Sequence, residues 1–256
     1  MAITLSTLSP ITRSYLSPAT NSPQTYTTST TSNHLIRSPS ANANKIVLTS
    51  RSHVRRPVSA AVSSSTGASP SSVETGGLLE RVEVFDLNGK SILISDLWKD
   101  RKAVVAFARH FGCVLCQKRA DMLAAKKDRM DASGVALVLI GPGTVDQART
   151  FSEQRKFKGE VYADPTYASY KALNFVSGIT TTFTPGSALK IIEVYMEGYR
   201  QDWELSFEKD TRTKGGWQQG GIMVAGPGIS NISYIHKDKE AGDDPEVEEI
   251  LKACCS

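Results

Sequence analysis

The chain carries at residues 109–118 the stretch Arg109-His110-Phe111-Gly112-Cys113-Val114-Leu115-Cys116-Gln117-Lys118. The apolar run before it, from Ala103 to Ala108, has the length of a buried strand. Residues 114–130 after it lack proline and glycine and are rich in helix-forming side chains, which predicts one continuous helix. The two cysteines therefore lie three residues apart at the junction of a predicted strand and a predicted helix.

The junction of a strand and a helix is a position that favours the thiolate form of cysteine. The first turn of a helix has unpaired backbone N–H groups and the positive end of the helix dipole. A thiolate there is stabilised relative to its thiol, so its pKa falls from about 8.5 toward about 7 or lower. We therefore expect Cys113, the more N-terminal and more exposed thiol, to attack an oxidant, and Cys116 to close a disulfide with it. A CxxC within a strand–helix–strand pattern is typical of a thioredoxin-like redox pair.

Two other interpretations of the cysteines stay open. In the first, Cys113 and Cys116 are buried structural thiols. In the second, they bind zinc together with His110, and Cys254 or Cys255 adds a fourth ligand. The chain has no second CxxC and no HxxxH, so we expect neither a metal nor a cofactor. Cys254 and Cys255 are then a C-terminal resolving pair or an inert tail.

Charged neighbours of the cysteine pair also have two interpretations each. His110 lowers the pKa of Cys113 if its imidazole is protonated, or it is an ordinary histidine at a strand end. Arg109 and Arg119 either stabilise the thiolate or lie in solvent.

The first 73 residues have the composition of a transit peptide. They contain no Asp or Glu, are dense in serine and threonine, and carry six basic residues: Arg13, Arg37, Lys45, Arg51, Arg55 and Arg56. Ser-rich, acid-free, mildly basic N-termini are typical of organelle targeting segments, and the uncharged first dozen residues resemble plastid leaders. We predict a disordered transit peptide over residues 1–60, a flexible linker over 61–75, and a location in the chloroplast, in the stroma. A disordered cytosolic tail is the alternative.

The excess of basic over acidic residues in the chain comes from this N-terminal segment. The whole sequence has 30 Lys and Arg against 26 Asp and Glu, and without the six leader cations the count is 24 against 26. No basic patch interleaved with aromatic side chains is present, so we expect no nucleic-acid partner. No run approaches the ~18 apolar residues of a membrane span, so we expect no membrane partner.

Residues 76–256 predict one α/β domain. Asn88-Gly89 between two short strands is a strong hairpin signal. Further strands are predicted over 135–140, 161–163, 221–225 and 232–235, helices over 165–173, 145–157, 188–203 and 246–253, and a polar loop over 210–216. Alternating strands and helices followed by a hairpin and a last helix predict a central mixed sheet with helices on both faces.

These elements resemble the peroxiredoxin-like family, in the branch of the AhpC/TSA domain that carries CxxC. The resemblance is carried by the strand and residues 109–116, by Leu139-Ile140-Gly141 and Tyr162-Ala163-Asp164-Pro165, and by the ending from Gly220 to Pro245. It extends over nearly all of residues 76–253. It implies a thioredoxin-like fold and a thiol-based antioxidant or disulfide-exchange role. The substrate is then a peroxide or a disulfide, and the reductant is of the thioredoxin type or glutathione.

The chain departs from the family pattern in two places. Ordinary peroxiredoxins have Pro and Thr seven and three residues before the peroxidatic cysteine. Before Cys113 these positions hold Ala106 and His110, and before Cys116 they hold Arg109 and Cys113. Thioredoxins have a cis-proline before the penultimate strand, where this chain has residues 218–221, Gln-Gln-Gly-Gly.

Two functional hypotheses follow. The first is a thiol–disulfide oxidoreductase with Cys113, Cys116, His110 and Arg109 at its catalytic site. The second is a non-catalytic redox-sensing or structural module on the same fold.

Overall fold

The computed structural model describes residues 77–256. The predicted transit peptide (1–60) and linker (61–75) therefore lie outside the described residues. Within 77–256, no helix combines the length and the apolar character needed to cross a membrane.

Seven strands form one mixed sheet in the order β2-β1-β5-β4-β3-β6-β7. The strands are β1 (Glu83–Phe85), β2 (Ser91–Leu93), β3 (Lys102–Phe107), β4 (Val135–Gly141), β5 (Glu160–Ala163), β6 (Gly221–Ala225) and β7 (Ile232–Lys237). β3 pairs in parallel with β4 and antiparallel with β6, and β6 pairs antiparallel with β7. The hairpin predicted around Asn88-Gly89 is formed by β1 and β2.

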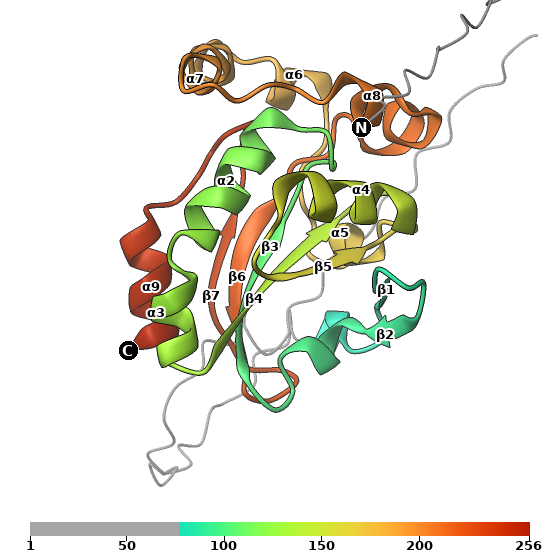
Figure 1. Cartoon of the computed structure of the whole chain (residues 1–256). Helices are drawn as coiled ribbons and strands as arrows, with labels where there is room; N and C mark the ends of the chain where they lie inside the picture. Colours follow the sequence, from blue (N-terminus) through green and yellow to red (C-terminus); the bar gives the residue numbers. More distant parts are fainter. Residues whose placement is uncertain (1–76) are drawn as a thin grey trace, which may run out of the picture. The chain divides into compact units, whose positions relative to one another are not determined.

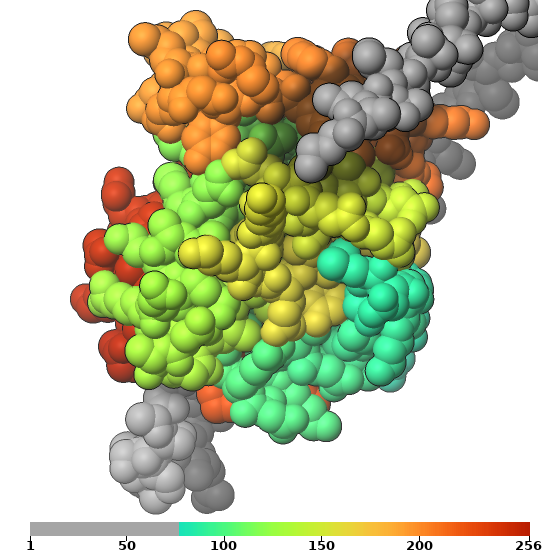
Figure 2. All heavy atoms as spheres, in the orientation of Figure 1, coloured from blue at the N-terminus to red at the C-terminus, as the bar shows by residue number. Residues whose placement is uncertain are grey.

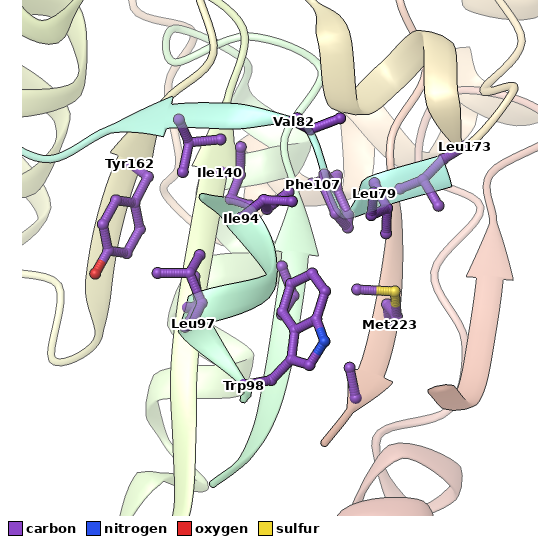
Figure 3. Close-up of a cluster of buried hydrophobic side chains, with 14 of the residues drawn as sticks. Leu79, Val82, Ile94, Leu97, Trp98, Phe107, Ile140, Tyr162, Leu173 and Met223 are labelled. Carbon is purple, nitrogen blue, oxygen red and sulfur yellow. The ribbon is translucent and has the colours of Figure 1, made fainter. Parts of the chain in front are cut away.

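The alternation of side chains along β3 separates two cores. Val105 and Phe107 belong to one core, and Val104 and Ala106 to the other. The first core packs against Trp98, the 3-10 helix η1 (Ile94–Leu97) and the region of α5 (Ala168–Ala172). Figure 3 shows part of this cluster, with side chains of η1 lying against the sheet.

The opposite face of the sheet is covered by α2 (Val114–Ala124), α3 (Lys127–Ala132), α4 (Val145–Arg155) and α9 (Val247–Cys255) (Figure 1). β3 lies between the parallel β4 and the antiparallel β6, and the chain ends with the β6–β7 hairpin and α9. This order of elements is the thioredoxin-like arrangement. The predicted fold class, a mixed sheet with helices on both faces, is confirmed.

Some predicted helix boundaries are wrong. The single helix expected over 114–130 is divided into α2 and α3, because the backbone of Lys126 (φ −102°, ψ 6°) leaves the helical region. α3 then places Met130 in the core, a tertiary requirement that helix propensity does not encode. α5 begins only at Ala168, since Tyr167 before it is left-handed (φ 58°).

The region expected to hold a helix over 188–203 and a polar loop over 210–216 is also different. α7 (Pro185–Met196) begins three residues earlier, because Thr184 caps it and Ser187 completes a capping box. It ends before Gly198, and a new helix, α8 (Trp203–Phe207), is capped by Asp202. The expected loop contains a π-helical turn, η2 (Thr211–Gly215).

We call residues 176–217 the cap. This segment connects α5 to β6 and contains α6 (Ile179–Thr182), α7, α8 and η2. Ser177 and Gln218 form an antiparallel bridge next to the two ends of the cap. Figure 1 shows α6, α7 and α8 beyond the N-terminal end of α2, which is the end that carries the two cysteines.

Candidate functional site

The cysteine pair lies where the sequence places it. β3 ends at Phe107, Cys113 is the N-cap residue of α2 in extended conformation (φ −71°, ψ 121°), and Cys116 is in the first helical turn. The first helical N–H group, that of Val114, donates to Oε1 of Gln201 in the cap at 2.9 Å. The cap therefore supplies a partner for a backbone donor that a helix leaves unpaired at its start.

Arg109 connects both sulfurs to the cap. Its backbone N–H donates to Sγ of Cys116 at 3.2 Å, and its guanidinium Nη1 lies 3.6 Å from Sγ of Cys113. The other terminal nitrogen, Nη2, donates to Oγ1 of Thr182 at 3.2 Å and to the carbonyl oxygen of Gly216 at 3.1 Å. The side chain is buried, so a cation is held beside the sulfur of Cys113 with little competition from water.

The two sulfurs have opposite electrostatic environments. A hydrogen bond from the Cys116 thiol and the charge of Arg109 hold the pKa of Cys113 well below its ordinary value, although burial opposes this effect. Burial, followed by the hydrogen bond to Cys113, raises the pKa of Cys116 well above its ordinary value. The surroundings therefore favour the thiolate form at Cys113 and the thiol form at Cys116.

His110 is next to this pair but does not supply a charge. Its ring is buried, and burial lowers its pKa to about 4. Nδ1 has no hydrogen-bond partner among the described residues. The imidazole is consequently neutral at pH 7, and the geometry favours an uncharged strand-end histidine over the imidazolium considered from the sequence.

The expectation that Cys113 is the more exposed thiol is wrong. The exposed fraction is 1% for Cys113 and 5% for Cys116. The reason is the cap, which lies directly on Gly112: a Cβ atom there would come within 2.5 Å of Oγ of Ser206 and 2.6 Å of the carbonyl oxygen of Asp202. The backbone N–H of Asp202 also donates to the carbonyl oxygen of Gly112. Glycine at this position allows the start of α8 to pack against the backbone next to Cys113.

A polar side chain, that of Gln219, lies in the region where thioredoxins have their cis-proline. Gln219 is fully buried, and its Nε2 donates to Oγ1 of Thr182 at 2.9 Å, the same oxygen that accepts from Arg109. The next residue, Gly220, passes so close to Phe107 that a Cβ would lie 1.9 Å from its carbonyl oxygen. Gln219 and Thr182 thus fix the position of Arg109. The sequence does not indicate Thr182 or Gln201 as site residues, because nothing local to them predicts contact with residues 109–114.

A cavity of about 500 Å³ opens between the cap and the cysteine region. Arg109, His110 and Val114 line it on the side of the cysteines. The cap contributes mostly large apolar side chains, among them Phe183, Ile191, Trp203, Phe207 and Trp217. Figure 2 shows the orange atoms of the cap at the top of this face, above the green region that includes α2.

Cys254 and Cys255 lie elsewhere. They are at the end of α9, where Sγ of Cys255 is 4.0 Å from the carbonyl oxygen of Arg129 in α3, and Figure 1 shows this end of the helix layer far from the cap. Burial raises the pKa of Cys254 to about 12. Residues 77–256 hold no group of three metal-ligating side chains that converge. This placement supports neither the zinc interpretation nor a C-terminal resolving pair for Cys113.

Arg119 has a structural role. It is buried and forms ion pairs with Asp238, at 2.9 Å, and with Asp244. It therefore does not lie in solvent, one of the two possibilities considered from the sequence. These pairs attach α2 to the segment that follows β7, and they hold the helix that carries the cysteines against the end of the sheet.

The comparisons with known proteins agree with this architecture. The family model described as "AhpC/TSA antioxidant enzyme" matches residues 122–240. This region begins after both cysteines and includes the whole cap, so the match concerns the body of the domain rather than the CxxC.

Three curated relatives are similar over most of the domain. The "Thioredoxin-like protein AAED1, chloroplastic" of Arabidopsis thaliana is 73% identical over 198 residues, which are 76% of this chain and 80% of the relative. The "Peroxiredoxin-like 2C" of Bos taurus is 28% identical over 176 residues, 66% of this chain and 75% of the relative. The "Prostamide/prostaglandin F synthase" of Salmo salar is 30% identical over 168 residues, 65% of this chain and 81% of the relative.

Proposed function

Because this chain belongs to the peroxiredoxin-like AhpC/TSA antioxidant-enzyme family, we propose that it is a thiol–disulfide oxidoreductase in which Cys113 and Cys116 cycle between dithiol and disulfide. Cys113 is the attacking thiolate and Cys116 is the resolving thiol. Arg109 stabilises the thiolate, and the neutral His110 borders the path to it.

The observation that carries this proposal is the asymmetry of the two sulfurs. A buried guanidinium faces Cys113 at 3.6 Å, whereas Cys116 accepts only a backbone N–H. Nucleophilic attack requires a thiolate. Resolution requires a second thiol beside the first sulfur, and burial raises the pKa of Cys116, which leaves the negative charge to Cys113 before oxidation.

With a hydroperoxide, the Cys113 thiolate attacks the terminal peroxide oxygen and breaks the O–O bond. The products are a sulfenic acid on Cys113 and an alkoxide, or hydroxide from hydrogen peroxide, which takes a proton from solvent. The Cys116 sulfur then attacks the sulfenic sulfur, a disulfide forms, and one water leaves. A dithiol of the thioredoxin type, or two molecules of glutathione, returns both cysteines to thiols and is itself oxidised to a disulfide. The reductant needs access to the disulfide, so we expect the cap to open in this step.

The proposed location in the cell is based on the composition of the N-terminal residues and on the name of one relative. The Arabidopsis relative is named chloroplastic, and the first 73 residues have the Ser-rich, acid-free composition of plastid leaders. We propose a chloroplast location, in the stroma, where the chain would meet thioredoxin-type and glutathione reductants.

The second candidate function is a non-catalytic redox-sensing or structural module. One observation favours it: both sulfurs are nearly inaccessible in this conformation. In that case oxidants reach Cys113 slowly, and no reductant turns the disulfide over.

Intact-mass analysis separates the two candidates. The reduced protein is treated with stoichiometric hydrogen peroxide, and then with a thioredoxin system or with glutathione. The oxidoreductase predicts rapid loss of two hydrogens and their return on reduction, over many cycles with peroxide consumption. A slow single oxidation without turnover supports the sensing module. Unchanged sulfurs in the folded protein contradict both redox interpretations.

A further inference from the structure

The cap has an unusual surface for a segment outside the core. Of the eleven exposed large apolar side chains in residues 77–256, nine lie between residues 176 and 217. They include Phe183, Trp203, Phe207 and Trp217, which also line the cavity. Apolar side chains gathered around a cavity on a soluble domain are typical of a ligand-binding or interaction site.

The charged side chains that line the cavity are both cations. Arg109, which is buried beside Cys113, and Arg212, which is exposed on η2, both line it. The described residues that line the cavity include no Asp or Glu. Arg212 forms no ion pair among the described residues, whereas the neighbouring Lys214 pairs with Asp210 at 2.9 Å.

Two carboxylates of the cap near the cavity have partners of their own. Asp202 caps α8 by accepting from the backbone N–H of Leu205, and Glu208 accepts from the side chain of Gln147. The cavity therefore combines apolar walls with an unpaired cation on η2, a combination that favours an elongated apolar molecule with one negatively charged end. Its volume of about 500 Å³ falls within the usual range for small-molecule sites.

We propose that the cavity under the cap binds an amphipathic carboxylate of the fatty-acid type. The carboxylate pairs with Arg212, and the hydrocarbon chain lies between the aromatic side chains of the cap and the surface formed by His110 and Val114. This site follows from the lining of the cavity, so it does not depend on the redox cycle proposed above. Because His110 and Val114, which line the cavity, flank Cys113 in the chain, the occupant should protect that sulfur from other reagents.

Tryptophan fluorescence provides a direct binding measurement. The chain has three tryptophans. Trp203 and Trp217 line the cavity, and Trp98 is fully buried in the other core. Dodecanoate, titrated into the reduced full-length protein below its micelle concentration, should change the emission in a saturable way. Dodecanol, which has the same chain without the charge, should bind about fivefold more weakly, which corresponds to ~1 kcal/mol for an ion pair at the protein surface.

Two charge variants locate the carboxylate. Arg212→Gln should reduce dodecanoate binding to the level of dodecanol without changing dodecanol binding. Lys214→Gln removes a cation two residues away that does not line the cavity, and it should leave the preference for the carboxylate intact. Equal losses in both variants would indicate a non-specific charge effect and overturn the proposal.

A competition experiment supplies a readout at the sulfur. Dodecanoate at a concentration that just saturates the parent protein should slow alkylation of Cys113 by iodoacetamide severalfold, and the effect should be smaller in Arg212→Gln at the same concentration. The proposal is overturned if no saturable fluorescence change occurs, if dodecanol binds as tightly as dodecanoate, or if the alkylation rate does not respond. The peroxide mass shift is measured separately, so loss of this inference and loss of the oxidoreductase function remain distinguishable.

Discussion

The guanidinium of Arg109 lies 3.6 Å from the sulfur of Cys113, and both groups are buried. The arginine reaches this position by bonds to Thr182 and Gly216, which are 73 and 107 residues away in the chain. The position of the cation beside the sulfur therefore depends on the cap. One segment thus both holds this cation and packs against the residue next to Cys113.

Replacement of Arg109 tests this electrostatic relationship. In Arg109→Gln the pKa of Cys113 should rise by about 1 or more, because loss of a nearby buried cation disfavours the thiolate. The rate of iodoacetamide alkylation at Cys113, measured from pH 5 to 10, reports this pKa. Arg101→Gln is the control, since Arg101 pairs with Glu160 in a partly exposed ion pair. An unchanged pH profile in Arg109→Gln would show that Arg109 does not stabilise the thiolate.

Single cysteine replacements test the two assigned roles. Cys113→Ser should abolish peroxide-dependent oxidation, because the remaining buried Cys116 has a pKa raised well above its ordinary value. Cys116→Ser should stop at a sulfenic or more oxidised Cys113, or at a mixed disulfide with the reductant. Cys255→Ser is a matched control at the far end of the helix layer, and it should cycle normally. Intact mass after peroxide measures all three, and a cycling Cys113→Ser protein would contradict the assignment.

A single methyl group at Gly112 should displace the cap. The added Cβ would lie 2.5 Å from Oγ of Ser206 and 2.8 Å from its backbone nitrogen, so α8 must shift. We expect Gly112→Ala to lose ~1–3 kcal/mol of stability, the usual range for overpacking, and to alkylate faster at Cys113.

Urea unfolding and alkylation kinetics measure these two effects. The control is Gly77→Ala, where a Cβ would meet no atom within 4 Å. If Gly112→Ala is both as stable and as slowly alkylated as the parent, the cap does not restrict access in solution.

The buried His110 predicts a loss of stability in acid. Its pKa is about 4 in the folded protein, whereas an unfolded histidine titrates near 6.5. Between these values the unfolded chain binds a proton that the native state does not, so stability falls as the pH decreases from about 6.5 to about 4, by up to ~3 kcal/mol. Urea unfolding at several pH values should show this slope in the parent, and His110→Asn should lack it.

Asp238 provides an internal check because its effect has the opposite sign. Its folded pKa is raised to about 6, mainly by burial. The native state therefore keeps a proton that the unfolded chain loses as the pH rises above about 4, and stability falls toward pH 6. Asp238→Asn should remove this component and leave the contribution of His110. Identical pH slopes in His110→Asn and the parent protein would contradict the burial of a neutral imidazole.

Much of the architecture could be predicted from local sequence. The apolar run before residue 109, the Asn88-Gly89 turn and the closing hairpin each depend on neighbours within a few residues, and the structure contains all three. The predictions for 188–203 and 210–216 were less accurate. The capping box at Thr184 starts α7, and the N-cap residue Asp202 starts a second helix, α8. Together they divide a stretch whose overall composition favours one helix.

The position of the two sulfurs at the start of a helix follows from residues 103–130 alone, because strand length, helix propensity and the CxxC spacing are local properties. The burial of Cys113, the partner of the Val114 N–H and the cation that faces the thiolate do not follow from that stretch. They depend on Gln201, Thr182 and Gly216, which meet residues 109–114 only when the cap folds over α2. Such contacts are made between side chains far apart in the chain, and no periodic pattern records which of them will meet.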